Sequence, residues 1–175
     1  TLMKMRQSEA RAVAKAIASK YNTTTIVDTI VCMDGCEVIG AYLADELSNA
    51  GIMSMNAHKT IYVVSPEYNS TGQIIFRQNL VPMIEGKNVL LLLASTTTGK
   101  TLSKCLDCID YYKGHIAAIA SIFSAVNKIS DIPIDSLFST ADLPDYKNYP
   151  HKDCPLCKAG KSIDAIVNGF GYSTL

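Results

Sequence analysis

The chain has 175 residues, of which 48% are hydrophobic and 18% are charged, so it is long and apolar enough to bury the core of one domain. Its 16 basic and 16 acidic residues cancel to a formal net charge of zero, which excludes binding to nucleic acid or to an anionic membrane through overall charge. The apolar runs are shorter than the roughly 20 residues that a membrane helix needs. We therefore expect a globular protein with neither a nucleic acid nor a membrane as its partner.

The N-terminal segment has the pattern of an amphipathic helix. Residues 5–21 place Ala10, Val13, Ala14 and Ile17 at helical spacing. The segment is charged, and it lacks the apolar core and cleavage site of a secretory signal. Six cysteines without such a signal favour reduced thiols, so the sequence predicts a cytoplasmic protein.

Strands and helices alternate along the following residues. Apolar runs predict strands over residues 26–33, 61–64, 89–93, 115–123 and 134–138, and helical patterns cover residues 38–48 and 100–112. This alternation predicts an α/β fold, a doubly wound and mainly parallel sheet of about five strands with flanking helices. Ligands of such sheets bind at the carboxyl ends of the strands, where the order of connections reverses.

Two irregular segments accompany this alternation. Residues 65–82 are punctuated by Pro66, Gly72 and Pro82, and a loop of this length is usually functional or disordered. From residue 142 onward the chain becomes polar and contains prolines. We expect residues 1–141 to form the core, and residues 142–175 to be an appendage of the same domain that carries the sequence CPLC and a short C-terminal helix.

The stretch VLLLLASTTTGKTL, residues 89–102, carries the strongest functional signal. Its five apolar residues predict a strand buried on both faces, and a turn of small residues, 94–99, precedes the expected helix. Backbone N–H groups at a positive helix end form an anion site, and Gly99 permits a close ligand approach that a side chain would block. The candidate phosphate-binding residues are Ser95, Thr96, Thr97, Thr98, Gly99, Lys100 and Thr101.

One interpretation of this stretch is a P-loop. The pattern AxxxxGKT at residues 94–101 satisfies a loose form of the P-loop motif, with alanine where glycine is usual. A P-loop NTPase also needs a strand that ends in Asp to hold magnesium. The next apolar run, residues 116–123, ends without an acid, so the match to a P-loop kinase is weak.

The same stretch resembles the signature of the type I phosphoribosyltransferases. In that family four apolar residues, two acids and two variable residues precede Thr-Thr-Gly and then Thr-Leu. The TTG at residues 97–99 and the TL at residues 101–102 fall in register with this signature. Leu93 and Ala94 stand where the family carries its acidic pair, which contacts the ribose hydroxyls and balances the charge that develops on the ribose during transfer.

Within the family the layout is most similar to that of orotate phosphoribosyltransferases, in the length of the loop 65–82 and in the C-terminal CPLC. The resemblance implies reversible transfer of ribose 5-phosphate from phosphoribosyl pyrophosphate to a pyrimidine base, with Mg²⁺ at the pyrophosphate and a homodimeric assembly. The missing acids favour an alternative, a regulatory protein that binds a phosphoribosyl ligand or nucleotide without turnover. A P-loop kinase is the third reading.

The segment after the first expected strand has two interpretations. Asp34, Gly35, Cys36 and Glu37 stand where the resemblance places the pyrophosphate-binding loop. Two carboxylates near a pyrophosphate would repel it unless magnesium lies between them. From the residues alone, the same segment is equally a tight turn with an acidic helix cap.

The loop 65–82 corresponds, by the resemblance, to the flexible hood that closes over the active site of the family. Such lids exclude water and complete the catalytic site. Arg77 is the only basic residue in this loop, and it is the candidate catalytic partner of the pyrophosphate leaving group.

The cysteines raise the question of a metal. Cys105 and Cys108 form one C-x-x-C pair, and Cys154 and Cys157 form another, with His151 three residues before it. The gap between the pairs exceeds the usual spacing of a zinc ribbon, and the first pair lies inside an expected helix. We keep His151, Cys154 and Cys157 as weak zinc candidates, and expect structural or incidental cysteines without zinc.

Overall fold

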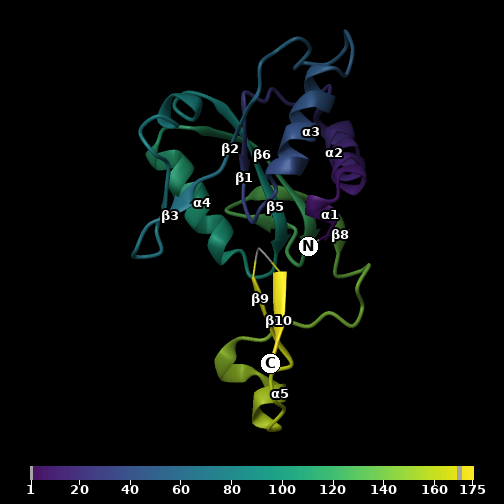
Figure 1. The fold of residues 1–175 in the computed structure, drawn as a ribbon, viewed down its shortest axis with the longest axis vertical. Helices are drawn as coiled ribbons and strands as arrows, with labels where there is room; N and C mark the ends of the chain where they lie inside the picture. The colour runs from purple at the N-terminus through teal and green to yellow at the C-terminus, as the bar shows by residue number, and fades with distance from the viewer. Residues whose placement is uncertain (1, 169–170) are drawn as a thin grey trace.

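The computed structural model describes residues 2–168 and 171–175, and within them six strands form a central sheet (Figure 1). Across the sheet the order is β2 (Tyr62–Val64), β1 (Thr29–Cys32), β5 (Asn88–Thr96), β6 (His115–Ser124), β8 (Ile132–Ser139) and β7 (Lys128–Ile129). All neighbours pair in parallel except β7, which is antiparallel to β8. The expected mainly parallel α/β sheet is confirmed, with β7 as an edge strand that the sequence pattern did not reveal.

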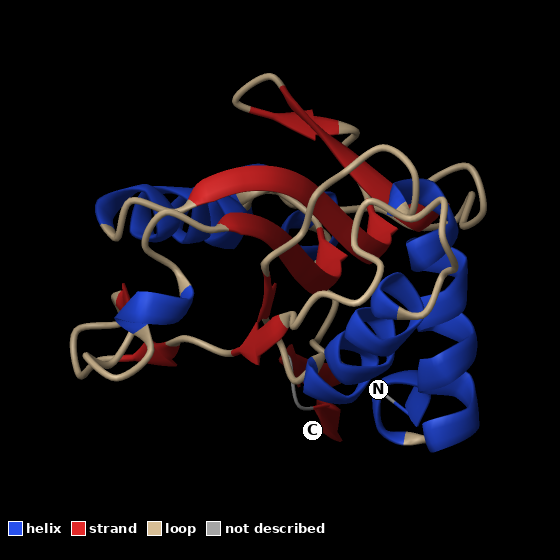
Figure 2. Cartoon of the chain, turned by 90° about the horizontal axis from the view of Figure 1, so that it is seen from above, coloured by secondary structure: helices blue, strands red, loops and turns tan. Residues whose placement is uncertain are grey.

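Helices cover both faces of this sheet (Figure 2). The helices α2 (Gln7–Tyr21) and α3 (Glu37–Ser48) pack on one face, and α4 (Lys100–Tyr111) packs on the other. The fold is therefore doubly wound, as the alternation of strands and helices predicts. Within the described residues no helix is both long and apolar enough to cross a membrane.

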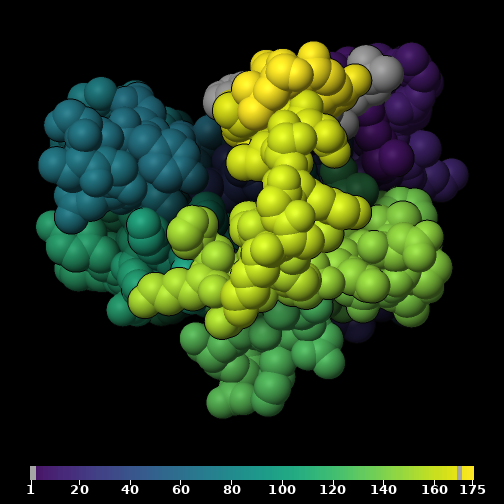
Figure 3. All heavy atoms as spheres, turned by 90° about the horizontal axis from the view of Figure 1, so that it is seen from below, coloured from purple at the N-terminus to yellow at the C-terminus, as the bar shows by residue number. Residues whose placement is uncertain are grey.

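The C-terminal tail differs from the expectation. After η2 (His151–Asp153) and α5 (Pro155–Lys158), the chain ends in two antiparallel strands, β9 (Ala165–Asn168) and β10 (Gly171–Thr174), where we expected a short helix. The β-branched and aromatic residues of both segments favour strands, which explains the error. The tail projects below the sheet in Figure 1, and Figure 3 shows it in yellow in front of the remaining chain.

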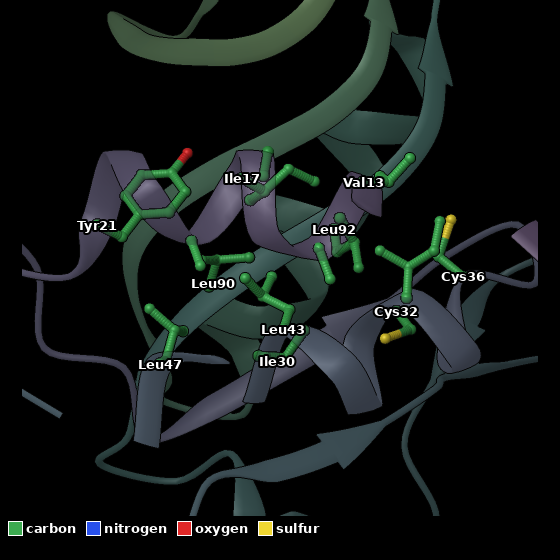
Figure 4. Close-up of a cluster of buried hydrophobic side chains, with 14 of the residues drawn as sticks. Val13, Ile17, Tyr21, Ile30, Cys32, Cys36, Leu43, Leu47, Leu90 and Leu92 are labelled. Carbon is green, nitrogen blue, oxygen red and sulfur yellow. The ribbon is translucent and has the colours of Figure 1, made fainter. Parts of the chain in front are cut away.

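Strand β5 connects the two halves of the core. Its side chains alternate, so Leu90 and Leu92 pack with α2 and α3 (Figure 4), while Leu91 and Leu93 pack with α4. None of these four leucines is more than 2% exposed. The expected strand buried on both faces is thus confirmed, and it holds the residues that follow it in a fixed position.

The carboxyl end of β5 lies further along the chain than expected. Residues 94–96 continue the strand, where residues 95 and 96 pair with Phe123 and Ser124 of β6. The expected turn over residues 94–99 is therefore too long, because pairing with a neighbouring strand prevailed over the turn preference of small residues. Only residues 97–99 connect β5 to α4.

The N-terminal helix is interrupted near its start. Arg6 adopts an extended backbone conformation and separates α1 (Leu2–Met5) from α2, whereas the sequence predicts one helix over residues 5–21. The short helix α1 contacts both α2 and α3. This break places α1 beside the turn that follows β1.

The loop 65–82 contains more structure than its sequence suggests. It holds a hairpin of β3 (Glu67–Tyr68) and β4 (Ile74–Ile75) and ends in η1 (Val81–Met83). Ile74 and Phe76 are buried against α4, where the Cys108 thiol donates to the Ile74 carbonyl at 3.3 Å and the Tyr112 hydroxyl to the Phe76 carbonyl at 3.1 Å. The second half of this loop is therefore anchored to α4.

Candidate functional site

A cavity of about 840 Å³ opens at the carboxyl ends of β1 and β5. These two strands are neighbours, but the helices that follow them cover opposite faces of the sheet, so their connections diverge. This is the switch point at which α/β sheets bind their ligands. Residues 93–102, Asp34 and Lys4 line the cavity, and Tyr146 and Val167 contribute from the C-terminal part of the chain.

The loop between β5 and α4 presents unpaired donors to this cavity. Gly99 caps α4 with a left-handed φ of +76°, and Thr97 and Thr98 are exposed. Among the residues that the structure describes, no backbone N–H group of residues 97–101 donates to a protein acceptor. Five such donors lie at the positive end of a 12-residue helix, where backbone N–H groups and the helix dipole favour an anion.

Thr96 adds a second unpaired polar group. Its side chain lines the cavity and is only 4% exposed, yet its hydroxyl oxygen has no hydrogen-bond partner in the described part of the chain. A buried hydroxyl without a partner is unfavourable, and a polar ligand in the cavity would relieve that cost. The neighbouring Ser95 and Lys100 also line the cavity and are exposed.

The turn after β1 faces this loop. Asp34 and Gly35 have φ values of +57° and +73°, two successive left-handed residues. The Asp34 carboxyl accepts the backbone N–H of Ala94. Burial raises the pKa of this carboxyl, against the opposing influence of the Lys4 ammonium and the Ala94 N–H.

The two remaining candidates of this turn have structural partners. Cys36 is buried, and burial raises the pKa of its thiol to about 12. Glu37 opens α3, and its Oε1 accepts a hydrogen bond of 2.7 Å from the Ser65 hydroxyl. Of the four candidates in this turn, Asp34 is the cavity-lining residue in the part of the chain that the structure describes.

Lys4 is a site residue that the sequence reasoning missed. Its side chain is only 4% exposed, and its ammonium donates to the backbone carbonyl of Asp34. A Cβ on Gly35 would lie 3.6 Å from the same ammonium, so the lysine packs directly against the turn. The sequence offers one signal for this residue. Lys4 stands alone among the apolar residues Leu2, Met3 and Met5, and a segment of that composition favours packing against the core.

The structure places Arg77 outside the cavity lining. Its Nε and Nη2 atoms donate to Oε2 of Glu67 at 2.8 and 2.6 Å, and both side chains are largely exposed. The pair joins the two sides of the β3–β4 hairpin. A role for Arg77 at a leaving group requires that it separate from Glu67, so this role stays a prediction.

The described lining of the cavity offers a divalent metal a single carboxylate. Mg²⁺ is bound in proteins through one or two carboxylates and the phosphates of the substrate. Among the described lining residues Asp34 is the one carboxylate, and the single Ala94 N–H that it accepts leaves acceptor capacity on its oxygens. Leu93 and Ala94 are apolar, and Leu93 is 2% exposed in the core beside α4.

The zinc candidates His151, Cys154 and Cys157 lie in the tail. Within residues 2–168 and 171–175, no three His, Cys, Asp or Glu side chains gather as a metal site. The backbone N–H and the thiol of Cys157 hydrogen-bond to the Cys154 sulfur and lower the pKa of Cys154. The same contact raises the pKa of Cys157.

These thiols should react in a definite order. At neutral pH iodoacetamide is expected to label Cys154 first, because its lowered pKa increases the thiolate fraction and the tail leaves it accessible. The four buried cysteines, whose pKa values are raised by burial, should react only after unfolding in urea. Mass spectrometry of the labelled peptides measures this order. Equal labelling of buried and tail cysteines in the folded protein would contradict it.

Comparisons with known proteins identify the fold. No family model matches the chain. Adenine phosphoribosyl transferase from Trypanosoma brucei, in complex with AMP, pyrophosphate and ribose-5-phosphate, is 14% identical, with 90% of this chain and 78% of that one covered and a TM-score of 0.56. Adenine phosphoribosyltransferase from Thermoanaerobacter pseudethanolicus is 16% identical, with coverages of 78% and 83% and a TM-score of 0.55.

UMP synthase from Leishmania donovani is also similar, at 13% identity and a TM-score of 0.54. The match covers 79% of this chain but only 29% of that larger protein. At these identities the likeness concerns the fold. The chain thus has an α/β fold with a cavity at its switch point, and this fold is similar to that of adenine and hypoxanthine phosphoribosyltransferases and of UMP synthase.

Proposed function

We propose that the chain binds phosphoribosyl pyrophosphate or a nucleotide in the cavity between β1 and β5. The observation that carries this proposal is the set of unpaired N–H groups of residues 97–101, which line the cavity at the N-terminus of α4. They would hold the 5′-phosphate, with Lys100 adding charge at the rim. The fold shared with an enzyme that was crystallised with AMP, pyrophosphate and ribose-5-phosphate supports the same ligand class.

For the reaction we propose transfer of ribose 5-phosphate to a pyrimidine base, as in orotate phosphoribosyltransferases. A ring nitrogen of the base gives up its proton to solvent and forms a bond to C1′ of the ribose, while the bond from C1′ to the pyrophosphate oxygen breaks and pyrophosphate leaves with the electron pair. The loop 97–101 would fix the 5′-phosphate, and the turn at Asp34 and Gly35 would lie at the pyrophosphate. Holding both ends of the ligand orients C1′ toward the base.

The second candidate function is ligand binding without turnover. Leu93 and Ala94 supply no charge where a ribose cation would develop, so the electrostatic part of catalysis is weakened at this site. A P-loop kinase is the least favoured reading, since β6 ends at Ser124 and residues 125–127 contain no acid for magnesium. We further propose that the protein is a cytoplasmic homodimer. Its partners would be phosphoribosyl pyrophosphate and a nucleobase or nucleotide, and neither a nucleic acid nor a membrane.

Calorimetric titration and a pyrophosphate-release assay test these functions together. We expect phosphoribosyl pyrophosphate and ribose 5-phosphate to bind, and ATP not to be hydrolysed. Release of pyrophosphate with orotate supports transfer to a pyrimidine. Release with adenine or hypoxanthine would instead show that the acceptor base is a purine. Binding without release for any base supports the regulatory protein. Failure of all phosphoribosyl ligands and nucleotides to bind would contradict the proposal.

A further inference from the structure

The C-x-x-C pair of the tail is a motif that the cavity function leaves unused. Cys154 and Cys157 belong to the segment around α5 that projects from the sheet (Figure 1). Cys157 is exposed and Cys154 is half-buried, whereas the other four cysteines of the chain are buried. The tail pair is therefore the one whose sulfurs a molecule in solution can reach without unfolding the core.

One turn of the backbone brings the two sulfurs together. Cys154 precedes α5 in an extended conformation, with φ −67° and ψ 112°, and its carbonyl accepts the Lys158 N–H at 3.1 Å. Residues three apart in such a turn lie on the same side of it. The backbone N–H and the thiol of Cys157 both hydrogen-bond to the Cys154 sulfur. The two thiols are thus in contact, with Cys154 as the acceptor and Cys157 as the donor.

This contact gives the two thiols different chemical roles. The hydrogen bonds from Cys157 stabilise a thiolate on Cys154 and lower its pKa, and the Lys158 ammonium acts in the same direction. The pKa of Cys157 is raised, because its proton is held in the hydrogen bond to Cys154. Since the thiolate is the nucleophile, Cys154 is the attacking sulfur, and Cys157 lies beside it as a second sulfur that attacks later.

A disulfide between these residues would be easy to form and to reduce. The Cα atoms of residues three apart in a helical turn are roughly 5 Å from each other, which lies within the range of about 4.4–6.8 Å that disulfides require. The bond would close a ring of very few residues, so it would restrict the unfolded chain much less than a disulfide across a long loop. Exposed disulfides with little such stabilisation are labile ones.

We propose that Cys154 and Cys157 form a dithiol site that exchanges with low-molecular-weight disulfides. The Cys154 thiolate attacks one sulfur of the incoming disulfide, whose S–S bond breaks, and the other half leaves as a thiolate that takes up a proton. Cys157 then gives up its proton, and its sulfur attacks Cys154 in this mixed disulfide and releases the second half. Two protein thiols are oxidised to one disulfide, while the incoming disulfide is reduced to two thiols. No residue of the cavity takes part.

The experiment exposes the reduced full chain to glutathione disulfide without oxygen. We expect one Cys154–Cys157 disulfide and two released glutathione molecules per chain, with the four buried cysteines still reduced. A mixed disulfide should persist on fewer than about one chain in ten, because a sulfur already in contact closes the ring at a high effective concentration. Dithiothreitol should restore both thiols. Mass spectrometry of the intact chain and of its peptides measures each species.

Serine variants separate the two roles, and both sites are accessible enough for the chain to fold. Cys157→Ser keeps a donor beside Cys154 but removes the second sulfur, so glutathione should accumulate on Cys154. Cys154→Ser should form its mixed disulfide on Cys157 at least about threefold more slowly, since a lower thiolate fraction is only partly offset by higher nucleophilicity. The double variant should not react with glutathione disulfide and should bind ribose 5-phosphate as the wild type does.

Several results would overturn this site and leave the proposed function of the cavity untouched. A stable mixed disulfide on the wild type would show that the second sulfur does not attack, and a disulfide to a buried cysteine would show that the pair is not the unit of exchange. Equal reaction rates of the two single variants would refute Cys154 as the attacking sulfur. A zinc ion that blocks oxidation of the purified protein until it is chelated would make the pair a metal site.

Discussion

Gly99→Ala is expected to weaken the binding of ribose 5-phosphate by about thirtyfold, which corresponds to about 2 kcal/mol. Gly99 has a φ of +76°, where a side chain costs roughly 1–2 kcal/mol, and a Cβ there would lie 2.8 Å from Cδ1 of Ile129. The loop can relieve this strain only by changing its backbone, and that change moves the N–H groups of residues 97–101 away from the phosphate. Calorimetric titration measures the loss.

Two further variants separate the local cause from a general loss of stability. Gly86 also has a left-handed φ, +68°, but a Cβ there meets no atom within 4 Å, and it lies before the amino end of β5. Gly86→Ala should cost a similar amount of stability and leave the affinity unchanged. The double variant Gly99→Ala, Ile129→Ala removes the contact between the new Cβ and the Ile129 side chain. If its affinity for ribose 5-phosphate stays low, the loss comes from the strained backbone at residue 99. Wild-type affinity of Gly99→Ala would refute the proposed phosphate loop.

The parts of this site that depend on adjacent residues were predictable from the sequence. The apolar run of residues 89–93 predicted a strand buried on both faces, and Gly99 before a helical pattern marked the end of the turn. Helix α4 begins at Lys100, as expected. The position of the loop at the carboxyl edge of the sheet followed from the alternation of strands and helices, whereas its place at the switch point depends on the order of strands in the sheet.

The parts that depend on distant residues were not predictable. Whether residues 94–96 form a turn or a strand depends on pairing with β6, which no local pattern reveals. Lys4 becomes a site residue through the packing of α1 on α2 and α3. Arg77 carries the only positive charge in its loop, but the fold brings Glu67 within 2.6 Å of it, across the hairpin. Charge and residue type indicate a candidate, while its partner depends on the tertiary structure.

Leu93, near the end of β5, lies at a position where packing in the core and a charged group for catalysis exclude each other. Leu93 belongs to the same buried cluster as Leu102 of α4, so its side chain fixes the helix whose first turn faces the cavity. An acid at this position would lose that contact and would require a charged partner in the core. The chain thus stabilises the proposed phosphate loop with a residue that supplies no charge, so under the proposed function this position favours ligand binding over fast turnover.

Gly40→Ala is expected to lower the free energy of unfolding by about 1–3 kcal/mol, although alanine favours a helix over glycine by about 1 kcal/mol. Gly40 lies where α3 packs on β1, and a Cβ there would be 2.4 Å from the Cys32 sulfur and 3.1 Å from Cγ1 of Val63. Cys32 is 1% exposed and lies inside the cluster of Figure 4, so its sulfur has little room to move. Urea unfolding of the variant measures the loss.

A double-mutant cycle with Cys32→Ala tests the proposed contact. Removal of the sulfur makes room for the new methyl group, so the two substitutions together should be more stable than the sum of their separate effects predicts, by about 0.5–3 kcal/mol. If the two effects on the free energy of unfolding are additive, the contact between the new Cβ and the Cys32 sulfur is not the cause of the loss in Gly40→Ala. Because α3 begins directly after the turn of Asp34 and Gly35, a displacement of this helix should also weaken phosphoribosyl pyrophosphate more than ribose 5-phosphate. The close approach of α3 to β1 would then support the pyrophosphate end of the cavity, as Gly99 supports the phosphate end.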